Sequence, residues 1–434
     1  MNSYHAIRNL RSPGTSSKQF KAGDVLVLFG ELFNRGYANG LVEEAQKRGM
    51  KIVSTTVGRR DKDGSLRPLT AEEVALQPQP FINVPLEAGF DLELDENGLS
   101  LVDHLKEAKL SDWEAFELPA GLLEPIRKKG RARFTKYVRE YLTELKKHIP
   151  PGSNVLFAHL MAGGVPRAKI VMPLMNRVVK GTGERFLSSE KLVRTSIGKI
   201  MLESFYEVTA ETFSTLVNES QELRQEIEKS GGQVSYLAYG YHGTEVFMGH
   251  DYVWQTYSPY LQGWAKMRLE NFARDFSKKG IHCCVYNCPE ILTNSSSIFA
   301  GVEVSLYPLL SALKKESPRS AKAMQVIENC QALLNPETTV EQLVDTAKKF
   351  LLTDLIRSHC IFDKWPQHNG PDQLEQMLNA SDELIGLHKD AKNLITFLLS
   401  EVVFEACGKV MISDSIRPEA PVAWINHDII AKIT

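Results

Sequence analysis

Continuous apolar runs alternate with amphipathic stretches along the start of the chain. Residues 24–30 (DVLVLFG) are apolar after the first position, which is typical of a parallel strand buried on both faces. Apolar positions then recur at helical spacing between residues 38 and 45, and a second strand-like run follows at residues 51–58. Strand, glycine turn, helix and strand predict a βαβ unit, whose helix N-terminus suits a nucleotide pyrophosphate.

The same alternation continues along most of the chain. Amphipathic segments such as residues 130–148, 196–220 and 259–279 have the spacing of helices. Between and beyond them lie further strand-like runs, at residues 81–86, 154–164, 233–240, 281–288 and 421–429. Strands separated by helices predict an α/β fold with one doubly wound, Rossmann-like parallel sheet, and a largely helical C-terminal extension packed on it.

Composition narrows the class of protein. The 434 residues are 43% hydrophobic and 24% charged, with a formal net charge of −2. These values argue against nucleic acid or an anionic membrane as the main partner. We find no apolar run long enough to span a bilayer and no secretory signal pattern. The six scattered cysteines fit neither a disulfide framework nor a zinc site, so we expect reduced thiols in a cytoplasmic enzyme.

The turn between the first strand and the first helix is a candidate cofactor site. Gly30 and Gly36 flank it, but the segment lacks the G-x-G-x-x-G pattern of dinucleotide sites. Its position supports the assignment more than its pattern does, and an ordinary strand-to-helix loop is the alternative. We expect Gly30, Phe33, Gly36 and Tyr37 to contact a nicotinamide cofactor.

The end of the second strand bears on which cofactor binds. An acidic residue there would accept hydrogen bonds from an adenosine ribose, whereas arginine would pair with a 2′-phosphate. This chain has Arg59 and Arg60 there, with Asp61 only after both. Guanidinium groups suit phosphate because they can pair with it through two parallel hydrogen bonds. The sequence therefore predicts NADPH as the preferred cofactor, with NADH also possible.

The stretch of residues 256–266 (TYSPYLQGWAK) contains a candidate catalytic pair. Tyr257 precedes Lys266 by nine positions, which would place them on opposite sides of one continuous helix. Ser258 is a good N-cap and Pro259 is favoured in the first helical position, so we expect the helix to begin after Tyr257. Tyr257 can then bend back toward Lys266.

This Tyr-x8-Lys spacing resembles that of the large trans-2-enoyl-CoA/acyl-carrier-protein reductases, an enlarged branch of the short-chain dehydrogenase superfamily. Residues 239–245 (YGYHGTE) are similar to that family's tyrosine-containing turn after the same strand. Residues 281–288, 293–298 (TNSSSI) and the Leu-Tyr pair at 306–307 also match its downstream order. The likeness extends over about residues 234–315. It implies reduction of the 2,3-double bond of trans-2-enoyl thioesters in fatty-acid synthesis, on acyl carrier protein or coenzyme A.

The chemistry of that reaction suggests roles for individual side chains. Hydride delivery to the β-carbon builds enolate charge on the thioester oxygen, which a tyrosine hydroxyl can stabilise by donating a hydrogen bond. We assign this role to Tyr257, with Tyr241 as a second candidate donor. Lys266 would lower the pKa of Tyr257 and hold the nicotinamide ribose. Thr293 and Ser295 could line the nicotinamide.

Two further candidates for cofactor contacts are Ala162 and Gly163, which end the strand-like run at residues 154–164. We expect residues 1–316 to form the nicotinamide-binding and catalytic domain, and the mostly helical residues 317–434 to be integral to it. We expect a monomer or a homodimer.

Three alternatives remain open at this stage. The same fold could reduce a carbonyl, with Tyr257 protonating the alkoxide. A nucleotide-binding scaffold without turnover is also compatible, because a fold does not imply chemistry. A metal-dependent hydrolase could use His242, Glu245, His250 and Asp251, although their spacing matches no common zinc site, and we expect no metal.

Overall fold

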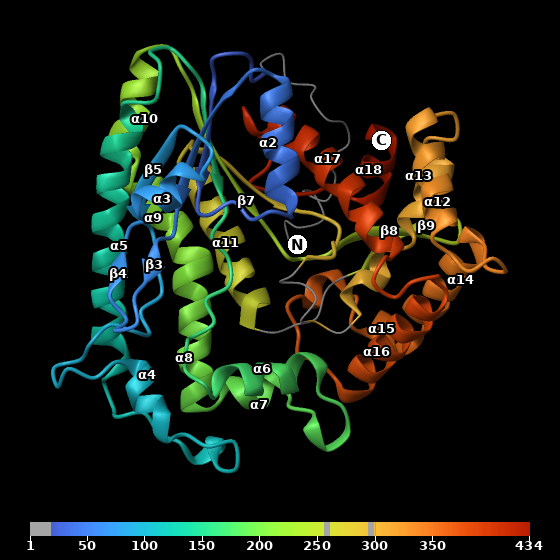
Figure 1. The fold of residues 1–434 in the computed structure, drawn as a ribbon, viewed down its shortest axis with the longest axis horizontal. Helices are drawn as coiled ribbons and strands as arrows, with labels where there is room; N and C mark the ends of the chain where they lie inside the picture. Colours follow the sequence, from blue (N-terminus) through green and yellow to red (C-terminus); the bar gives the residue numbers. More distant parts are fainter. Residues whose placement is uncertain (1–18, 256–260, 294–298, 300) are drawn as a thin grey trace.

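A seven-stranded parallel sheet forms the centre of the protein (Figure 1). The computed structural model describes residues 19–255, 261–293, 299 and 301–434. The sheet order is β11-β10-β7-β6-β1-β2-β5, and every neighbouring pair is parallel. The strands are β1 (Val25–Phe29), β2 (Lys51–Thr56), β5 (Phe81–Pro85), β6 (Val155–His159), β7 (Val234–Tyr239), β10 (His282–Asn287) and β11 (Val422–Trp424). Each of these strands overlaps a run predicted from the sequence.

The path of the chain through the sheet creates a crevice beside β1. From β1 the chain proceeds outward to β2 and β5, and then returns to β6 on the other side of β1 before continuing toward β11. Val25 of β1 pairs in register with Lys51 of β2 and with Val155 of β6. Because the connections leave β1 and β6 in opposite directions, a crevice opens at the carboxyl ends of these two strands, where α/β proteins bind ligands.

Helices cover both faces of the sheet (Figure 1). The helices are α2 (Tyr37–Lys47), α3 (Ala71–Ala75), α4 (Leu101–His104), α5 (Leu123–Lys146), α6 (Val171–Lys180), α7 (Ser189–Val193), α8 (Ser196–Phe205), α9 (Thr212–Glu219), α10 (Gln221–Lys229), α11 (Leu261–Lys278), α12 (Leu309–Glu316), α13 (Ala321–Ala332), α14 (Val340–Leu351), α15 (Asp354–Ser358), α16 (Pro371–Gly386), α17 (Ile395–Ser415) and α18 (His427–Ile433). Helices α5, α9 and α11 pack on one face, and α2 and α17 pack on the other.

Strand β1 shows why the apolar runs are continuous. Its side chains alternate between the faces, so Val25, Val27 and Phe29 join the core beneath α5, α9 and α11. Leu26 and Leu28 join the core beneath α2 and α17. All five are almost completely buried. A strand covered on both faces needs apolar side chains at every position, and this is the pattern that the sequence carries.

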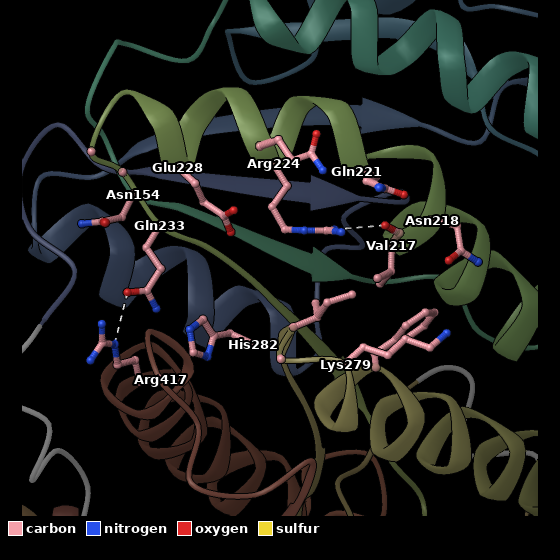
Figure 2. A pocket seen from close by; sticks show the side chains of 16 residues that line it. Asn154, Val217, Asn218, Gln221, Arg224, Glu228, Gln233, Lys279, His282 and Arg417 are labelled. Atoms are coloured by element: carbon pink, nitrogen blue, oxygen red, sulfur yellow. Dashed lines mark hydrogen bonds between the residues drawn. The ribbon is translucent and has the colours of Figure 1, made fainter.

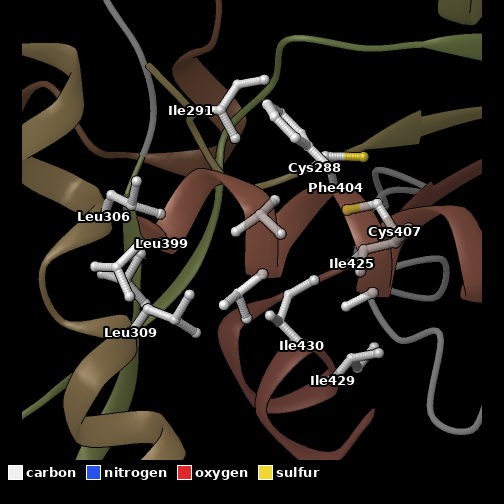
Figure 3. Packing of buried hydrophobic residues seen from close by; sticks show 14 of the residues in the cluster. Cys288, Ile291, Leu306, Leu309, Leu399, Phe404, Cys407, Ile425, Ile429 and Ile430 are labelled. Carbon is white, nitrogen blue, oxygen red and sulfur yellow. The ribbon is translucent and has the colours of Figure 1, made fainter. Parts of the chain in front are cut away.

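The C-terminal helices are part of the same core. Cys288 and Ile291, which follow β10, pack with side chains of α17, α18 and the segment around Leu306 (Figure 3). Helix α17 also lies unusually close to α2, since a Cβ atom at Gly40 would be 1.8 Å from the carbonyl oxygen of Phe404. The predicted fold class, a Rossmann-like sheet with a helical C-terminal part packed on it, is confirmed.

Two local predictions from the sequence differ from the structure. The segment expected as one helix at residues 196–220 consists of α8, a π-helical stretch at Tyr206–Glu211 and α9. An antiparallel hairpin, β8 (Thr244–Met248) with β9 (Asp251–Gln255), was not predicted, and nor was the short hairpin of β3 (Arg59–Arg60) with β4 (Leu66–Arg67). Both hairpins lie outside the main sheet, so neither carries the continuous apolar signal of a buried strand.

Candidate active site

A cavity of about 300 Å³ lies in the crevice at the carboxyl ends of β1, β2, β5 and β6. Segments that directly follow these four strands line it, including Glu31, Val57, Glu87 and Met161. Residues on α8 and in the following π-helical stretch, Ser204 and Val208, form another wall. The cavity therefore lies where the topology of the sheet predicts a nucleotide site.

The glycine turn between β1 and α2 forms one side of this cavity. Gly30 has a φ of 120°, and a Cβ atom there would lie 3.2 Å from Leu160 Cβ and from Met161 Cγ. This backbone conformation and the close approach of the next strand both favour glycine. Gly36 immediately precedes α2, where a Cβ atom would meet nothing within 4 Å. Phe33 lines the cavity with 71% of its surface exposed. The turn is therefore narrow near β6 and open near the helix.

Tyr37 has a different environment from its neighbours in the turn. Its hydroxyl donates a hydrogen bond to the carbonyl oxygen of Pro289, and its ring stacks on Tyr239 with 5.6 Å between centroids. Tyr37 therefore links the start of α2 to the segments that follow β7 and β10. It does not line the 300 Å³ cavity.

The segment after β6 closes the cavity from the other side. Ala162 lines the cavity, and the carbonyl oxygen of Gly163 accepts a hydrogen bond of 2.9 Å from Thr209 Oγ1. Gly164 also lines it, and a Cβ atom there would lie 2.5 Å from the carbonyl oxygen of Ser204. Gly164 therefore packs directly against α8, while Ala162 faces the cavity.

The two arginines expected to meet a 2′-phosphate already have carboxylate partners. Arg59 donates from Nη1 and Nη2 to the two carboxylate oxygens of Glu31, each at 2.9 Å. Arg60 donates from Nε to Glu87 at 2.5 Å. Glu87 also accepts a hydrogen bond of 2.5 Å from Arg167. The positive charge predicted at this end of β2 is thus matched by acidic groups that the sequence analysis did not identify.

Lys266 lies at the opposite, β7 side of the crevice. It is buried on α11, and its Nζ donates a hydrogen bond of 2.6 Å to the carbonyl oxygen of Tyr239, the last residue of β7. Burial lowers the pKa of Lys266 to about 8. Burial also lowers the pKa of His159, at the end of β6, to about 3, and the charge of Lys266 adds to this effect. The ammonium group of Lys266 is therefore the cation at this edge, and His159 is neutral.

Tyr241 follows the same strand, two residues after the carbonyl group that Lys266 holds. Its side chain packs against an apolar cluster built mainly from α6 and α8, which includes Leu174, Met201 and Leu261. It also interacts with the buried carboxyl group of Glu290, in the segment that follows β10. Burial raises the pKa of Glu290 to about 8. Glu290 was not among the residues expected from the sequence, because a single glutamate after a strand carries no distinctive pattern.

The remaining predicted residues are only partly described. Tyr257 lies outside the described residues, as do Ser258, Pro259 and Ser295. Thr293 is described and half-buried, in the segment that follows β10. The structure therefore brings Lys266, Tyr241 and Thr293 to the carboxyl edge of the sheet. Helix α11, which carries Lys266, spans Leu261–Lys278 and so begins four residues after Tyr257.

The four residues considered for a metal do not converge on one point. His242 is buried between aromatic rings, whereas His250 and Asp251 are exposed at the tip of the β8–β9 hairpin. Asn426 bonds both the backbone and the carboxylate of Glu245. Throughout the described part of the chain, no group of three or more His, Cys, Asp or Glu residues could hold a metal ion. The geometry does not support the hydrolase alternative.

A second cavity, of about 600 Å³, lies at the opposite edge of the sheet (Figure 2). Polar side chains line it near the amino ends of β7 and β10, among them Asn154, Arg224, His282 and Arg417. None of the predicted site residues that the structure describes lies there. Among these residues, Lys266, Tyr241 and Thr293 lie at the carboxyl edge instead.

Comparisons with known proteins identify the family. The family model described as "Enoyl-acyl carrier protein reductase FabMG" matches residues 4–434. An apo structure of FabMG, described as a novel type of enoyl-acyl carrier protein reductase, is 46% identical over 98% of this chain and 97% of that one, with a TM-score of 0.93. An NADH-bound structure of FabMG is 39% identical over the same shares, with a TM-score of 0.78. No curated protein matches the chain significantly.

This chain belongs to the FabMG family of enoyl-acyl carrier protein reductases. It is an oxidoreductase of fatty-acid synthesis, and its substrate is an enoyl group on acyl carrier protein. The predicted reaction and class of enzyme are confirmed, and they take precedence over the carbonyl and hydrolase alternatives. No helix among the described residues is both long enough and apolar enough to cross a membrane.

Proposed function

We propose that this FabMG-family reductase uses NADH, bound in the cavity beside β1, and the side chains of Tyr257, Lys266 and Tyr241 to reduce trans-2-enoyl thioesters. The observation that carries the proposal is the buried ammonium group of Lys266 at the carboxyl end of β7. It lies on the edge of the sheet that also bears the glycine turn and the 300 Å³ cavity. A buried lysine is costly unless its charge is used, which favours a functional role.

The cavity fits a dinucleotide in shape and in chemistry. A Cβ atom at Gly36 would meet nothing within 4 Å, and the start of α2 after Gly36 offers N–H groups for a pyrophosphate. We assign Phe33 and the Ala162–Gly163 backbone to the same site. Tyr37 would act through the contact that it makes with Pro289, next to the nicotinamide end.

The acidic partners of the arginines favour NADH over NADPH. Glu31 neutralises Arg59, and the remaining lone pairs of its carboxylate would accept hydrogen bonds from ribose hydroxyl groups. Glu87 engages Arg60, so neither guanidinium is available to a 2′-phosphate without losing a carboxylate. The FabMG structure with bound NADH agrees with this assignment. We therefore place NADH ahead of the NADPH that the arginines alone suggested.

The side chains around Lys266 divide the chemical work. The bound cofactor supplies the hydride. The hydroxyl group of Tyr257 donates a hydrogen bond to the thioester oxygen, where enolate charge develops, and Tyr241 donates to the same oxygen from the β7 turn. The Lys266 ammonium stabilises the ionised form of Tyr257 and so lowers its pKa. Thr293 and Ser295 line the nicotinamide side of the site.

Several properties of the substrate and the assembly stay as predictions of the sequence. Coenzyme A thioesters would also be substrates if the enzyme binds the acyl group alone, through the apolar cluster around α6 and α8. A monomer or homodimer in the cytoplasm is expected, and so is the integral packing of residues 317–434 on residues 1–316.

The test is the oxidation of NADH, followed by absorbance, with crotonyl-CoA and a longer trans-2-enoyl acyl carrier protein. We expect Tyr257→Phe to lose at least about 100-fold in kcat, because removing one donor to a developing oxyanion typically has that effect. Tyr252→Phe is the matched control, since Tyr252 lies on β9 and bonds Glu316 far from the crevice. Near-full activity of Tyr257→Phe would refute the assignment.

A further inference from the structure

The turn that carries Tyr241 is anchored on both sides by buried groups. Before Tyr241, the carbonyl oxygen of Tyr239 accepts the hydrogen bond from Lys266. After it, the backbone N–H of His242 donates a hydrogen bond of 2.7 Å to Asn287 Oδ1 on β10. Gly240 lies so close to the same amide that a Cβ atom there would be 2.1 Å from Asn287 Oδ1. The backbone around Tyr241 therefore has little freedom to move.

The side chain of His242 adds a second anchor. Only 1% of the residue is exposed, and its ring stacks between Phe362 and Trp365, with centroids at 4.7 and 4.0 Å. Its Nδ1 atom lies 3.4 Å from Oε1 of Glu270, a residue of α11 that is completely buried. The imidazole is thus held by two aromatic rings and by a carboxylate. Because His242 directly follows Tyr241, its fixed position also fixes the backbone after Tyr241.

Glu270 is itself fully engaged. Its Oε1 accepts a hydrogen bond of 3.0 Å from Asn287 Nδ2, and its Oε2 accepts one of 3.1 Å from Arg274. Burial alone would raise the pKa of this carboxyl group, but His242 and Arg274 together bring it below the usual value. Glu270 follows Lys266 by four residues, so both lie on the same face of α11. One face of α11 therefore contacts the turn on both sides of Tyr241: Lys266 binds the backbone of Tyr239 before it, and Glu270 contacts the side chain of His242 after it.

We propose that the Glu270–His242 pair is a positioning device that fixes the hydroxyl group of Tyr241 toward the substrate. The proposal rests on the proposed function, in which Tyr241 donates to the thioester oxygen. A buried carboxylate with polar partners contributes little to stability compared with apolar packing of the same volume, so stability alone does not account for this pair. Positioning does account for it, because an offset of about 1 Å in a catalytic group can cost about 100-fold in rate.

A double-mutant cycle separates positioning from a purely structural role. We compare wild type, Glu270→Gln, Tyr241→Phe and the double variant, measuring kcat and the KM for NADH with a trans-2-enoyl acyl carrier protein. Glu270→Gln keeps the size of the side chain and should lower kcat at least about tenfold, with the NADH KM unchanged. If Glu270 acts through Tyr241, the same substitution should have no further effect on kcat once the Tyr241 hydroxyl is absent.

Asp24→Asn is the matched control. Asp24 is a buried carboxylate at the amino end of β1, and its Oδ1 accepts a hydrogen bond of 2.8 Å from the backbone of Asn154. Asp24→Asn removes a buried charge that accepts hydrogen bonds, so it should lower the unfolding temperature. Because Asp24 lies at the opposite edge of the sheet, the substitution should leave kcat unchanged. His242→Phe is the second variant in case Glu270→Gln does not fold, because a phenyl ring preserves the stacking and removes the polar contacts of the imidazole with Glu270 and with the carbonyl oxygen of Phe362. Like Glu270→Gln, His242→Phe should lower kcat when Tyr241 is present and have no further effect on kcat in the Tyr241→Phe background.

The outcomes distinguish this inference from the proposed function beneath it. Full activity of Tyr241→Phe would show that Tyr241 is not a donor, and the positioning proposal would be lost with that role. A large loss in Tyr241→Phe, with Glu270→Gln lowering kcat by the same factor in both backgrounds, would overturn the positioning proposal alone. The same conclusion would follow if Glu270→Gln or His242→Phe left kcat unchanged.

Discussion

Replacing Glu31 by glutamine should change the cofactor preference of this enzyme. The carboxylate of Glu31 accepts two hydrogen bonds from Arg59 and carries the negative charge nearest to the turn after β1. Glutamine keeps the size of the side chain but removes the charge. Arg59 would then be released from its partner at the end of β2, where a 2′-phosphate would be bound.

The size of the effect follows from two contributions. The side chains of Arg59 and Glu31 are 38% and 23% exposed, so water screens their pairing; its loss costs about 1 kcal/mol or less of stability and affects both cofactor complexes alike. A released guanidinium that bonds a phosphate contributes about 1 to 2 kcal/mol. Removing the repulsion between Glu31 and the phosphate adds about 1 kcal/mol in a solvated site. Together these give about 2 to 3 kcal/mol in favour of NADPH, or a change of roughly 30- to 150-fold.

The assay is kcat/KM for NADPH and NADH in parallel, with the enoyl substrate at a fixed saturating concentration. We expect the ratio of the two values to rise by that factor in Glu31→Gln and to return toward wild type in Glu31→Gln/Arg59→Ala. Glu219→Gln serves as the control, since Glu219 on α9 pairs with Arg139 on α5 and its side chain is as exposed as that of Glu31. An unchanged ratio in Glu31→Gln, or a rise that persists without Arg59, would refute the reasoning.

Two predictions concern pH. Burial holds the pKa of Lys266 near 8, so wild-type kcat should fall above pH 8, where the ammonium group loses its proton. In Lys266→Arg this fall in kcat at alkaline pH should disappear. A fall at the same pH in the variant would contradict the assignment. The pKa of Glu290 is raised to about 8, so the native state holds a proton that the unfolded chain releases above its ordinary pKa. Its contribution to stability should therefore be present below about pH 4 and decline toward pH 8, by up to about 1.4 kcal/mol per pH unit. Urea unfolding between pH 5.5 and 7.5 should show this slope in wild type and not in Glu290→Gln, and parallel slopes would count against a buried neutral carboxyl.

The main sheet could be predicted because burial on both faces leaves a strong local signal. The central strands β1 and β6 are buried at every position, so each is a nearly continuous apolar run that can be recognised without knowledge of its partners. The hairpin of β8 and β9 lies apart from that sheet and was missed. The same holds for the π-helical interruption between α8 and α9, which does not alter the amphipathic spacing.

The sequence alone determined the fold class, the helix that carries Lys266, and the enzyme family whose Tyr-x8-Lys motif the pair Tyr257 and Lys266 resembles. These depend on residues that are close along the chain. Only the tertiary structure decided which charges meet. Glu31 contacts Arg59, and Glu270 contacts His242, although 28 positions separate the two residues of each pair in the sequence. The segments that meet in these contacts share no sequence pattern. Electrostatic partners act through space at distances of a few ångströms, so the cofactor preference and the anchoring of the Tyr241 turn follow from the folded arrangement and not from local order along the chain.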